Sequence, residues 1–258
     1  MFPRSPNCVI RQPARACTIC AALLVWVCAI DAPAENLPEI RPALVGSMKR
    51  SLVNLIDPHA LMQKGVQHAA VLFTTSIRPS GSTYGCSVYG GTPGSDALGD
   101  EVRRQLRESV FLPAVYNHHY TYANFNGAVT FAVLEGKPHL RVYATQEKSE
   151  LADGHDFISP QSIYITKHIY DPISYPAGSW DTEQRPATVE VELSVDAKGQ
   201  IKDVRALGGN SADQKFADTA LKRIRNCTFL PAFRNGRPVD STIHYTFVFI
   251  PNNFMWKP

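Results

Sequence analysis

Cysteine and charge are both scarce in the part of the chain that could form a fold. Four of the six cysteines lie within the first 34 residues, so Cys86 and Cys227 are the two that remain beyond them. Two cysteines without paired spacing do not provide the four ligands of a structural zinc site. Charged residues make up 19% of the chain and the formal charge is +3. A chain so close to neutral lacks the clustered basic face that nucleic-acid binding requires.

Signatures of catalysis are also missing. The sequence contains no Gly-x-Ser-x-Gly, His-Glu-x-x-His or Walker-type loop, which are the usual nucleophile, zinc and nucleotide motifs. His118 and His119 are adjacent, and neighbouring residues of a strand point to opposite faces, which is poor geometry for one metal ion. We therefore predict a protein that is not an enzyme and has neither a metal nor a cofactor.

One long apolar run is present, and it lies at the N-terminus. Three arginines precede residues 16–30, and Ala32-Pro33-Ala34 follows them. This order is typical of a secretory signal peptide, here residues 1–34, cleaved before Glu35. A helix of fifteen residues is roughly 22 Å long, shorter than the ~30 Å hydrocarbon core, which favours cleavage over an uncleaved membrane anchor. The cleaved chain would carry a formal charge of +1, because three arginines and Asp31 leave with the peptide.

An internal repeat dominates the remainder. Phe111-Leu112-Pro113-Ala114 recurs as Phe229-Leu230-Pro231-Ala232, 118 positions later. The same offset superposes further residues without a gap: Gly81 on Gly199, Gly90-Gly91 on Gly208-Gly209, and Pro58 on Pro176. Two copies are too few for a solenoid, so the repeat predicts two similar small domains in tandem.

In the second copy, apolar residues alternate with polar ones from Val189 to Val195, and residues 196–199 form a turn signal. This pattern predicts a strand and a hairpin, followed by a second strand from Ile201 to Leu207. An apolar helical stripe comes next and consists of Phe216, Ala220, Leu221 and Ile224. Asn235-Gly236 then predicts a tight turn before a last alternating strand, 243–249.

The first copy repeats this order, with strands expected at 71–77 and 129–133 and a helix stripe at Leu98, Val102 and Leu106. We therefore expect an α+β protein of two tandem domains, each a small antiparallel sheet with one helix packed on it, in the order β-β-α-β. The expected boundaries are 51–140 for the first domain, 141–170 for a linker and 171–254 for the second domain.

The two remaining cysteines fall one in each copy, so neither copy can form an internal disulfide. Two interpretations stay open. In an oxidising compartment Cys86 and Cys227 can form a bridge between the copies. Alternatively, they are two separate buried thiols.

The second copy resembles the C-terminal domain of the TonB family. The residues that carry the resemblance are Tyr175-Pro176, the strand 189–195, Asp196-Ala197-Lys198-Gly199, Phe229-Leu230-Pro231-Ala232, Asn235-Gly236-Arg237-Pro238-Val239 and Phe247-Val248-Phe249. The first copy is a degenerate version, with Asp57-Pro58 in place of Tyr175-Pro176.

The resemblance implies a periplasmic protein that contacts an extended segment of an envelope partner, such as a TonB-dependent outer-membrane receptor. Members of the family receive that segment near the Tyr-Pro pair and at the edge of the sheet, which is β-augmentation. It makes Tyr175 and Pro176 the candidate contacts, while a packed turn at the entry of a strand is the purely structural alternative.

The chain departs from a TonB-type energy transducer in the length of the spacer before its first domain, which in a transducer is long enough to reach across the periplasm. Only residues 35 to about 50 separate the expected cleavage site from the first copy, and sixteen extended residues reach about 55 Å. We therefore expect a free periplasmic binding protein. The alternative is an anchored transducer of TonB-dependent transport that keeps its N-terminal segment.

Overall fold

The computed structural model describes residues 36–153, 156–164, 176, 187–209 and 214–249. All of them belong to one compact unit, Asn36–Pro258. The predicted signal peptide lies outside the described residues. Within the described ranges, no helix has the length and apolar character needed to cross a membrane.

The described elements are five helices and fourteen strands. The helices are α1 (Leu52–Leu55), α2 (Pro58–Gln63), α3 (Asp96–Glu108), α4 (Lys148–Asp153) and α5 (Gln214–Arg225). The strands are β1 (Ile40–Arg41), β2 (His68–Ile77), β3 (Thr83–Gly91), β4 (Ala114–Tyr116), β5 (His119–Leu134), β6 (Lys137–Tyr143), β7 (Phe157–Ile158), β8 (Gln161–Tyr164), β9 (Ala187–Val195), β10 (Ile201–Gly209), β11 (Thr228–Leu230), β12 (Ala232–Arg234), β13 (Arg237–Val239) and β14 (Ser241–Phe249). The predicted α+β class is confirmed, because helices pack on antiparallel sheets.

The N-terminal sheet, which we define as the eight-stranded sheet built around β5, has the order β1-β4-β5-β2-β3, with β6 and β8 also on β5 and β11 on β8. Helix α3 packs against β3 and β2. Its predicted stripe of Leu98, Val102 and Leu106 is fully buried, because side chains three and four residues apart share one face of a helix. The sheet has more strands than the expected β-β-α-β order, since β1, β4, β6 and β8 also pair within it.

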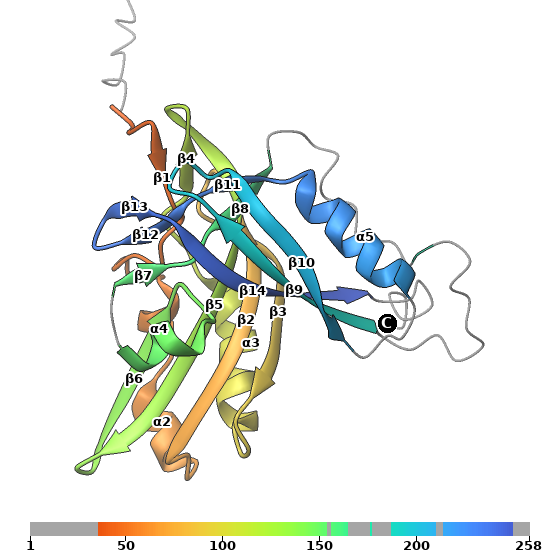
Figure 1. Cartoon of the computed structure of the whole chain (residues 1–258). Helices are drawn as coiled ribbons and strands as arrows, with labels where there is room; N and C mark the ends of the chain where they lie inside the picture. The colour runs from red at the N-terminus through yellow and green to blue at the C-terminus, as the bar shows by residue number, and fades with distance from the viewer. Residues whose placement is uncertain (1–35, 154–155, 165–175, 177–186, 210–213, 250–258) are drawn as a thin grey trace, which may run out of the picture. The chain divides into compact units, whose positions relative to one another are not determined.

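The C-terminal sheet has the order β10-β9-β14, and α5 packs on β9 and β10 (Figure 1). Residues of β9 alternate as predicted, with Val189, Val191, Leu193 and Val195 buried. Phe216, Ala220 and Ile224 of α5 are buried against them, and Leu221 is half-buried. Their common core also includes Phe249, whose ring meets that of Phe216 edge to face at 5.0 Å.

Local structure recurs at the spacing of the sequence repeat. Strand β10 begins and ends 118 residues after β3, β12 does the same relative to β4, and α5 begins 118 residues after α3. Asn235 and Gly236 form the predicted turn with φ of 51° and 74°, and Asn117 and His118 form its counterpart with φ of 49° and 62°. Both turns have the positive φ pair that joins antiparallel strands tightly.

The segment expected to be a plain linker, 141–170, contains secondary structure instead. Helix α4 and strands β7 and β8 lie within it. Strand β8 pairs with both β5 and β11, and Ile163 and Leu230 are buried in the core of the N-terminal sheet. The sequence did not predict these strands, because elements of two to four residues are too short to show a periodic pattern. The two halves of the chain therefore share strands.

Candidate functional site

The outer edge of β14 is the feature of the C-terminal sheet that can bind another chain. Strand β14 pairs with β9 from Ser241 to Phe249 without a shift in register. No strand among the described residues pairs with its other side. The backbone N–H of His244 points away from β9, toward a carboxylate of Glu147. Because backbone direction alternates along a strand, Thr242, His244, Thr246 and Val248 direct their N–H and C=O groups outward; we call these groups the β14 edge.

The strand that occupies the equivalent position in the N-terminal sheet is covered. Strand β5 pairs with β2 on one side, and on the other side its residues Ala128 to Leu134 pair with β6. A tight turn at Glu135 and Gly136, both with positive φ, brings β6 back onto β5. Residues 128–131 correspond at the repeat offset to 246–249 of β14. The place that β6 takes on β5 is therefore unpaired on β14 among the described residues.

The β14 edge also lacks lysine, arginine, proline and bulges, which usually block strand addition. Strand β6, an edge strand itself, carries Lys137, Pro138, His139 and Arg141. The opposite edge of the C-terminal sheet, β10, carries Lys202, Asp203 and Arg205 and has two irregularities in its register. Strand β14 contains no lysine, arginine or proline. It is therefore the less protected edge of this sheet.

A row of charges crosses the C-terminal sheet at the β14 edge. Arg205 of β10 and His244 of β14 both lie opposite Glu192 of β9. The Arg205 Nη2 and Glu192 Oε1 atoms are 2.8 Å apart, and His244 Nδ1 lies 3.1 Å from Glu147 Oε2. The hydrogen bond with Glu147, together with the nearby charges of Glu147, Glu190 and Glu192, raises the pKa of His244. This favours the protonated imidazole.

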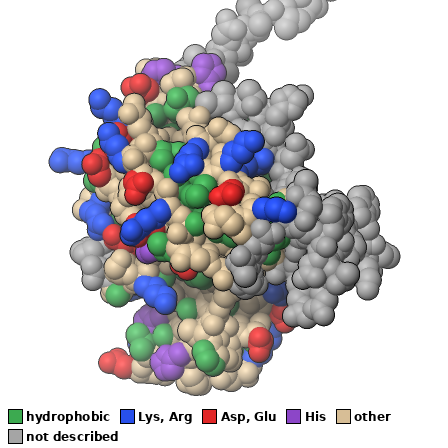
Figure 2. All heavy atoms as spheres, turned by 45° about the vertical axis from the view of Figure 1, so that its right-hand side comes forward, with side chains coloured by type: hydrophobic (Ala, Val, Ile, Leu, Met, Phe, Trp, Pro, Cys, Tyr) green, Lys and Arg blue, Asp and Glu red, His purple; other side chains and the backbone are tan. Residues whose placement is uncertain are grey.

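Charge is mixed on the face of the molecule that Figure 2 shows. Figure 2 shows one face on which lysine and arginine side chains are interspersed with aspartate and glutamate. Recognition at the β14 edge would depend on backbone groups and on a few charges.

The side chain of Tyr245 also holds β14 against the N-terminal sheet. The hydroxyl of Tyr245 interacts with Asn126, Ser162 and Asn124, and burial raises its pKa despite these hydrogen bonds. Such a half-buried and hydrogen-bonded side chain holds the strand in place. The β14 edge is therefore presented by a strand whose position is set by contacts on two sides.

Tyr175 and Pro176 are the two contact residues predicted from the resemblance. Tyr175 lies outside the described residues, and Pro176 is described as half-buried without regular structure. The aligned pair Asp57-Pro58 begins α2, where Asp57 Oδ1 accepts hydrogen bonds from the N–H groups of His59 and Ala60 at 2.9 and 3.3 Å. A carboxylate at this position caps a helix.

Both cysteines are free thiols in the structure, so the possible disulfide is not formed there. Cys86 Sγ lies 3.2 Å from Thr75 Oγ1, and Cys227 Sγ donates to the carbonyl of Arg223 at 3.3 Å. Burial raises the pKa of the Cys227 thiol. Such an environment keeps a thiol protonated and unreactive.

Within the ranges that the structure describes, no group of His, Cys, Asp and Glu side chains has the arrangement of a metal site. The residues at the β14 edge that sequence reasoning missed are Glu147 and His244. Nothing local in the sequence identifies Glu147, which lies in the segment expected to be a linker. The absence of lysine and proline from 241–249 could have indicated an unprotected strand edge, because edge strands usually carry such residues.

Comparison with known proteins agrees with this geometry. Residues 173–251 match the family model of the Gram-negative bacterial TonB protein C-terminal, a range that includes every strand of the C-terminal sheet. No curated protein matches the chain. Residues 173–251 thus have the sequence pattern of TonB C-terminal domains, a family whose members interact with envelope proteins such as outer-membrane receptors.

Proposed function

We propose that the protein is a non-catalytic periplasmic protein that binds an extended segment of an envelope partner by strand addition to the β14 edge. A TonB-dependent outer-membrane receptor is the partner that the family suggests. The observation that carries the proposal is that no described strand pairs with the β14 edge, whereas the equivalent strand of the N-terminal sheet is covered by β6. An incoming strand would pair with backbone groups that no described strand pairs with.

The N-terminal half has a different role in this proposal. We infer that it is a degenerate copy of the same domain, which the recurrence of elements at an offset of 118 supports. With β6 on β5, it has no free edge at the equivalent place and serves as the support of the C-terminal sheet. Tyr175 and Pro176 remain proposed contacts of the bound segment. An anchored transducer would need the uncleaved N-terminal segment, which lies outside the described residues.

The test uses one substitution that changes only the outward face of the backbone. In Thr246→Pro the lost N–H is one that points away from β9, so pairing within the sheet is kept while a donor for the added strand disappears. Thr246→Val is the matched control, because it keeps the N–H and favours a strand. Both variants are made in the mature chain, residues 35–258, and their folding is checked by circular dichroism.

Binding is measured with synthetic ten-residue peptides copied from the periplasmic N-terminal segments of TonB-dependent receptors. We expect Thr246→Pro to weaken binding at least about tenfold, or about 1.4 kcal/mol, and Thr246→Val to bind as the parent does. Hydrogen exchange at the outward amides of β14 should slow when a peptide is bound. If Thr246→Pro folds and binds as tightly as the parent, docking is elsewhere and the proposal fails.

A further inference from the structure

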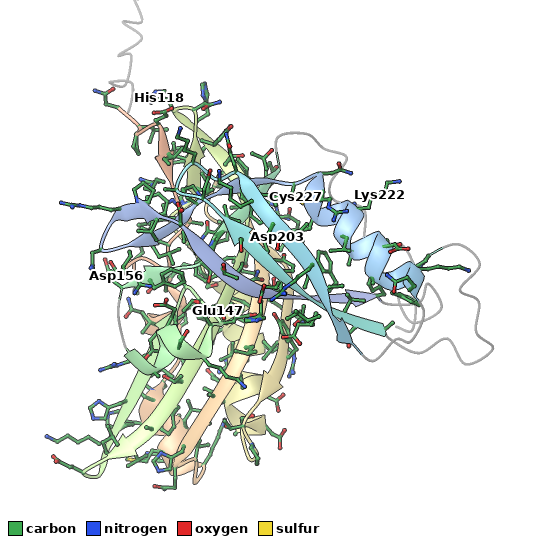
Figure 3. All side chains as sticks on the ribbon, viewed as in Figure 1. His118, Glu147, Asp156, Asp203, Lys222 and Cys227 are labelled. Carbon is green, nitrogen blue, oxygen red and sulfur yellow. The ribbon has the colours of Figure 1, made fainter. Side chains whose placement is uncertain are left out.

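No strand among the described residues pairs with the β14 edge, but one of its N–H groups already donates a hydrogen bond. Glu147 Oε1 accepts the backbone N–H of His244 at 2.6 Å, and Glu147 Oε2 lies 3.1 Å from the imidazole Nδ1. The Glu147 side chain is 15% exposed and that of His244 is 47% exposed. Figure 3 labels Glu147 beside β14. A single carboxylate thus contacts both the backbone and the side chain at one position of the edge.

This carboxylate is held in place by the N-terminal sheet. The N–H of Glu147 donates to Thr145 Oγ1 at 3.1 Å, and its carbonyl accepts the N–H of Leu151 at 3.0 Å. The preceding residue, Gln146, donates to the carbonyls of Phe73 and Gly127 at 2.8 and 3.2 Å. Glu147 therefore approaches His244 from a fixed segment and not as a freely moving surface side chain.

The position of Glu147 is the one that a residue of an added strand would take. Arg205, Glu192 and His244 lie in register across β10, β9 and β14. An added strand would place its next side chain beyond His244 in this row, and its backbone carbonyl on the His244 N–H. Glu147 supplies a substitute for both, since one of its oxygens accepts the N–H and the other meets the imidazole.

The charges around His244 determine which segment can replace this carboxylate. Glu147 faces the imidazole from the segment before α4, Glu190 and Glu192 face it from β9, and Glu192 is paired with Arg205 of β10. When Glu147 moves away, two acidic groups and two basic groups remain if the imidazole is protonated. An acidic side chain restores the contact that Glu147 made, whereas a basic one meets the protonated imidazole at close range.

We propose that Glu147 is a built-in competitor for the β14 edge, and that the segments displacing it carry an acidic side chain opposite His244. This inference rests on the proposed function, since it names the partner chemistry and the regulation of that same edge. The N-terminal half then both supports the C-terminal sheet and restricts access to it.

The probe is a set of three fluorescein-labelled peptides, Thr-Val-Thr-Xaa-Thr-Val-Thr, in which Xaa is Glu, Gln or Lys. Affinity is measured by fluorescence anisotropy with the mature parent chain, with Glu147→Ala and with Asp203→Ala. The last variant is the matched control, because it removes one carboxylate from β10, the opposite edge strand of the same sheet. We expect Glu147→Ala to bind the Glu peptide about tenfold tighter than the parent does, and Asp203→Ala to leave the affinity unchanged.

In Glu147→Ala the Glu peptide should also bind tighter than the Gln peptide, and the Lys peptide weakest. His244→Gln should keep binding and lose the preference for Glu. If the parent and Glu147→Ala bind each peptide equally tightly, Glu147 is not a competitor for the β14 edge. If Glu147→Ala binds the Glu, Gln and Lys peptides equally tightly, the edge has no preference for an acidic side chain.

Failure of this inference is distinguishable from failure of the proposed function. If Thr246→Pro abolishes binding of these peptides while Glu147→Ala changes nothing, strand addition stands and the competitor is wrong. If no peptide binds Glu147→Ala at millimolar concentration, or if Thr246→Pro binds them as the parent does, the edge does not accept strands and both proposals fail.

Discussion

Gly199 lies directly against the carbonyl oxygen of Phe229, with which a Cβ atom at position 199 would collide. Gly81 has the same relationship to the carbonyl of Phe111, and the two pairs are 118 residues apart. Both glycines have positive φ, 81° and 82°. The turn between the first two strands of each half thus touches the Phe-Leu-Pro-Ala segment of the same half.

Gly199→Ala and Gly81→Ala should each lower the free energy of unfolding by at least about 2 kcal/mol. Alanine at these positions would have an unfavourable positive φ, and its Cβ atom would also collide with a backbone carbonyl oxygen. Gly65→Ala is the control, since Gly65 has a φ of 82° and nothing within 4 Å of its Cβ position. Its cost should be about 1 kcal/mol. Urea denaturation of the three variants measures the difference, and equal costs would mean that the contact is unimportant.

Stability should depend on the titration of His244. The Glu147 hydrogen bond raises the pKa of His244 in the folded protein, so protonation favours folding. This contribution is complete below the unfolded value of about 6.5 and is lost as the pH rises through the raised folded value. Because His244 is half-exposed, we expect less than about 1 kcal/mol.

Two measurements check the role of His244. Unfolding free energies between pH 5.5 and pH 8.5 should decline less in His244→Gln than in the parent. In an NMR titration, Glu147→Gln should lower the pKa of His244, while Asp203→Asn leaves it in place. A His244 pKa that does not respond to Glu147→Gln would contradict the contact.

Gln146 should be one of the most sensitive polar residues. Its side chain donates to the carbonyls of Phe73 and Gly127 and accepts from the hydroxyl of Tyr89 at 2.9 Å. Gln146→Ala leaves these groups without their partner, which should cost about 1–3 kcal/mol. The substitution Gln67→Ala, at an exposed position, should cost much less in the same denaturation experiment.

Tyr89 offers an independent check on that network. Burial raises its pKa to about 12, so its phenolate should not form below strongly alkaline pH. Because the folded state disfavours the ionised form, its contribution to stability is lost as the pH rises above the unfolded value of about 10. Comparison by ultraviolet titration should show one late-ionising tyrosine fewer in Tyr89→Phe than in the parent, and equal numbers would contradict burial of Tyr89.

Export can be tested by the intact mass of the protein recovered from a Gram-negative cell envelope. We expect a chain that begins at Glu35, because residues 1–34 have the order of a signal peptide. A full-length mass in the inner-membrane fraction would instead favour the anchored transducer.

Much of the fold could be predicted because it is encoded locally. The alternation in 189–195 predicted β9, the stripes of Val102 and Ile224 predicted α3 and α5, and Asn235-Gly236 predicted a hairpin turn. In each case the side chains that must be buried lie within one or two turns of helix or a few strand residues, so their spacing is visible in the sequence. The resemblance that the family match confirms rests on the same local patterns.

The sequence by itself determined the principal strands and the helix of each copy, the resemblance of the C-terminal part to the TonB family and the turns that need glycine. Only the tertiary structure decided that β8 and β11 join the two halves, that β6 covers β5 while no described strand covers β14, and that Glu147 meets His244. These are pairings between residues far apart in the chain. Each is made by backbone groups or by a single polar contact, and neither leaves a periodic pattern in the sequence.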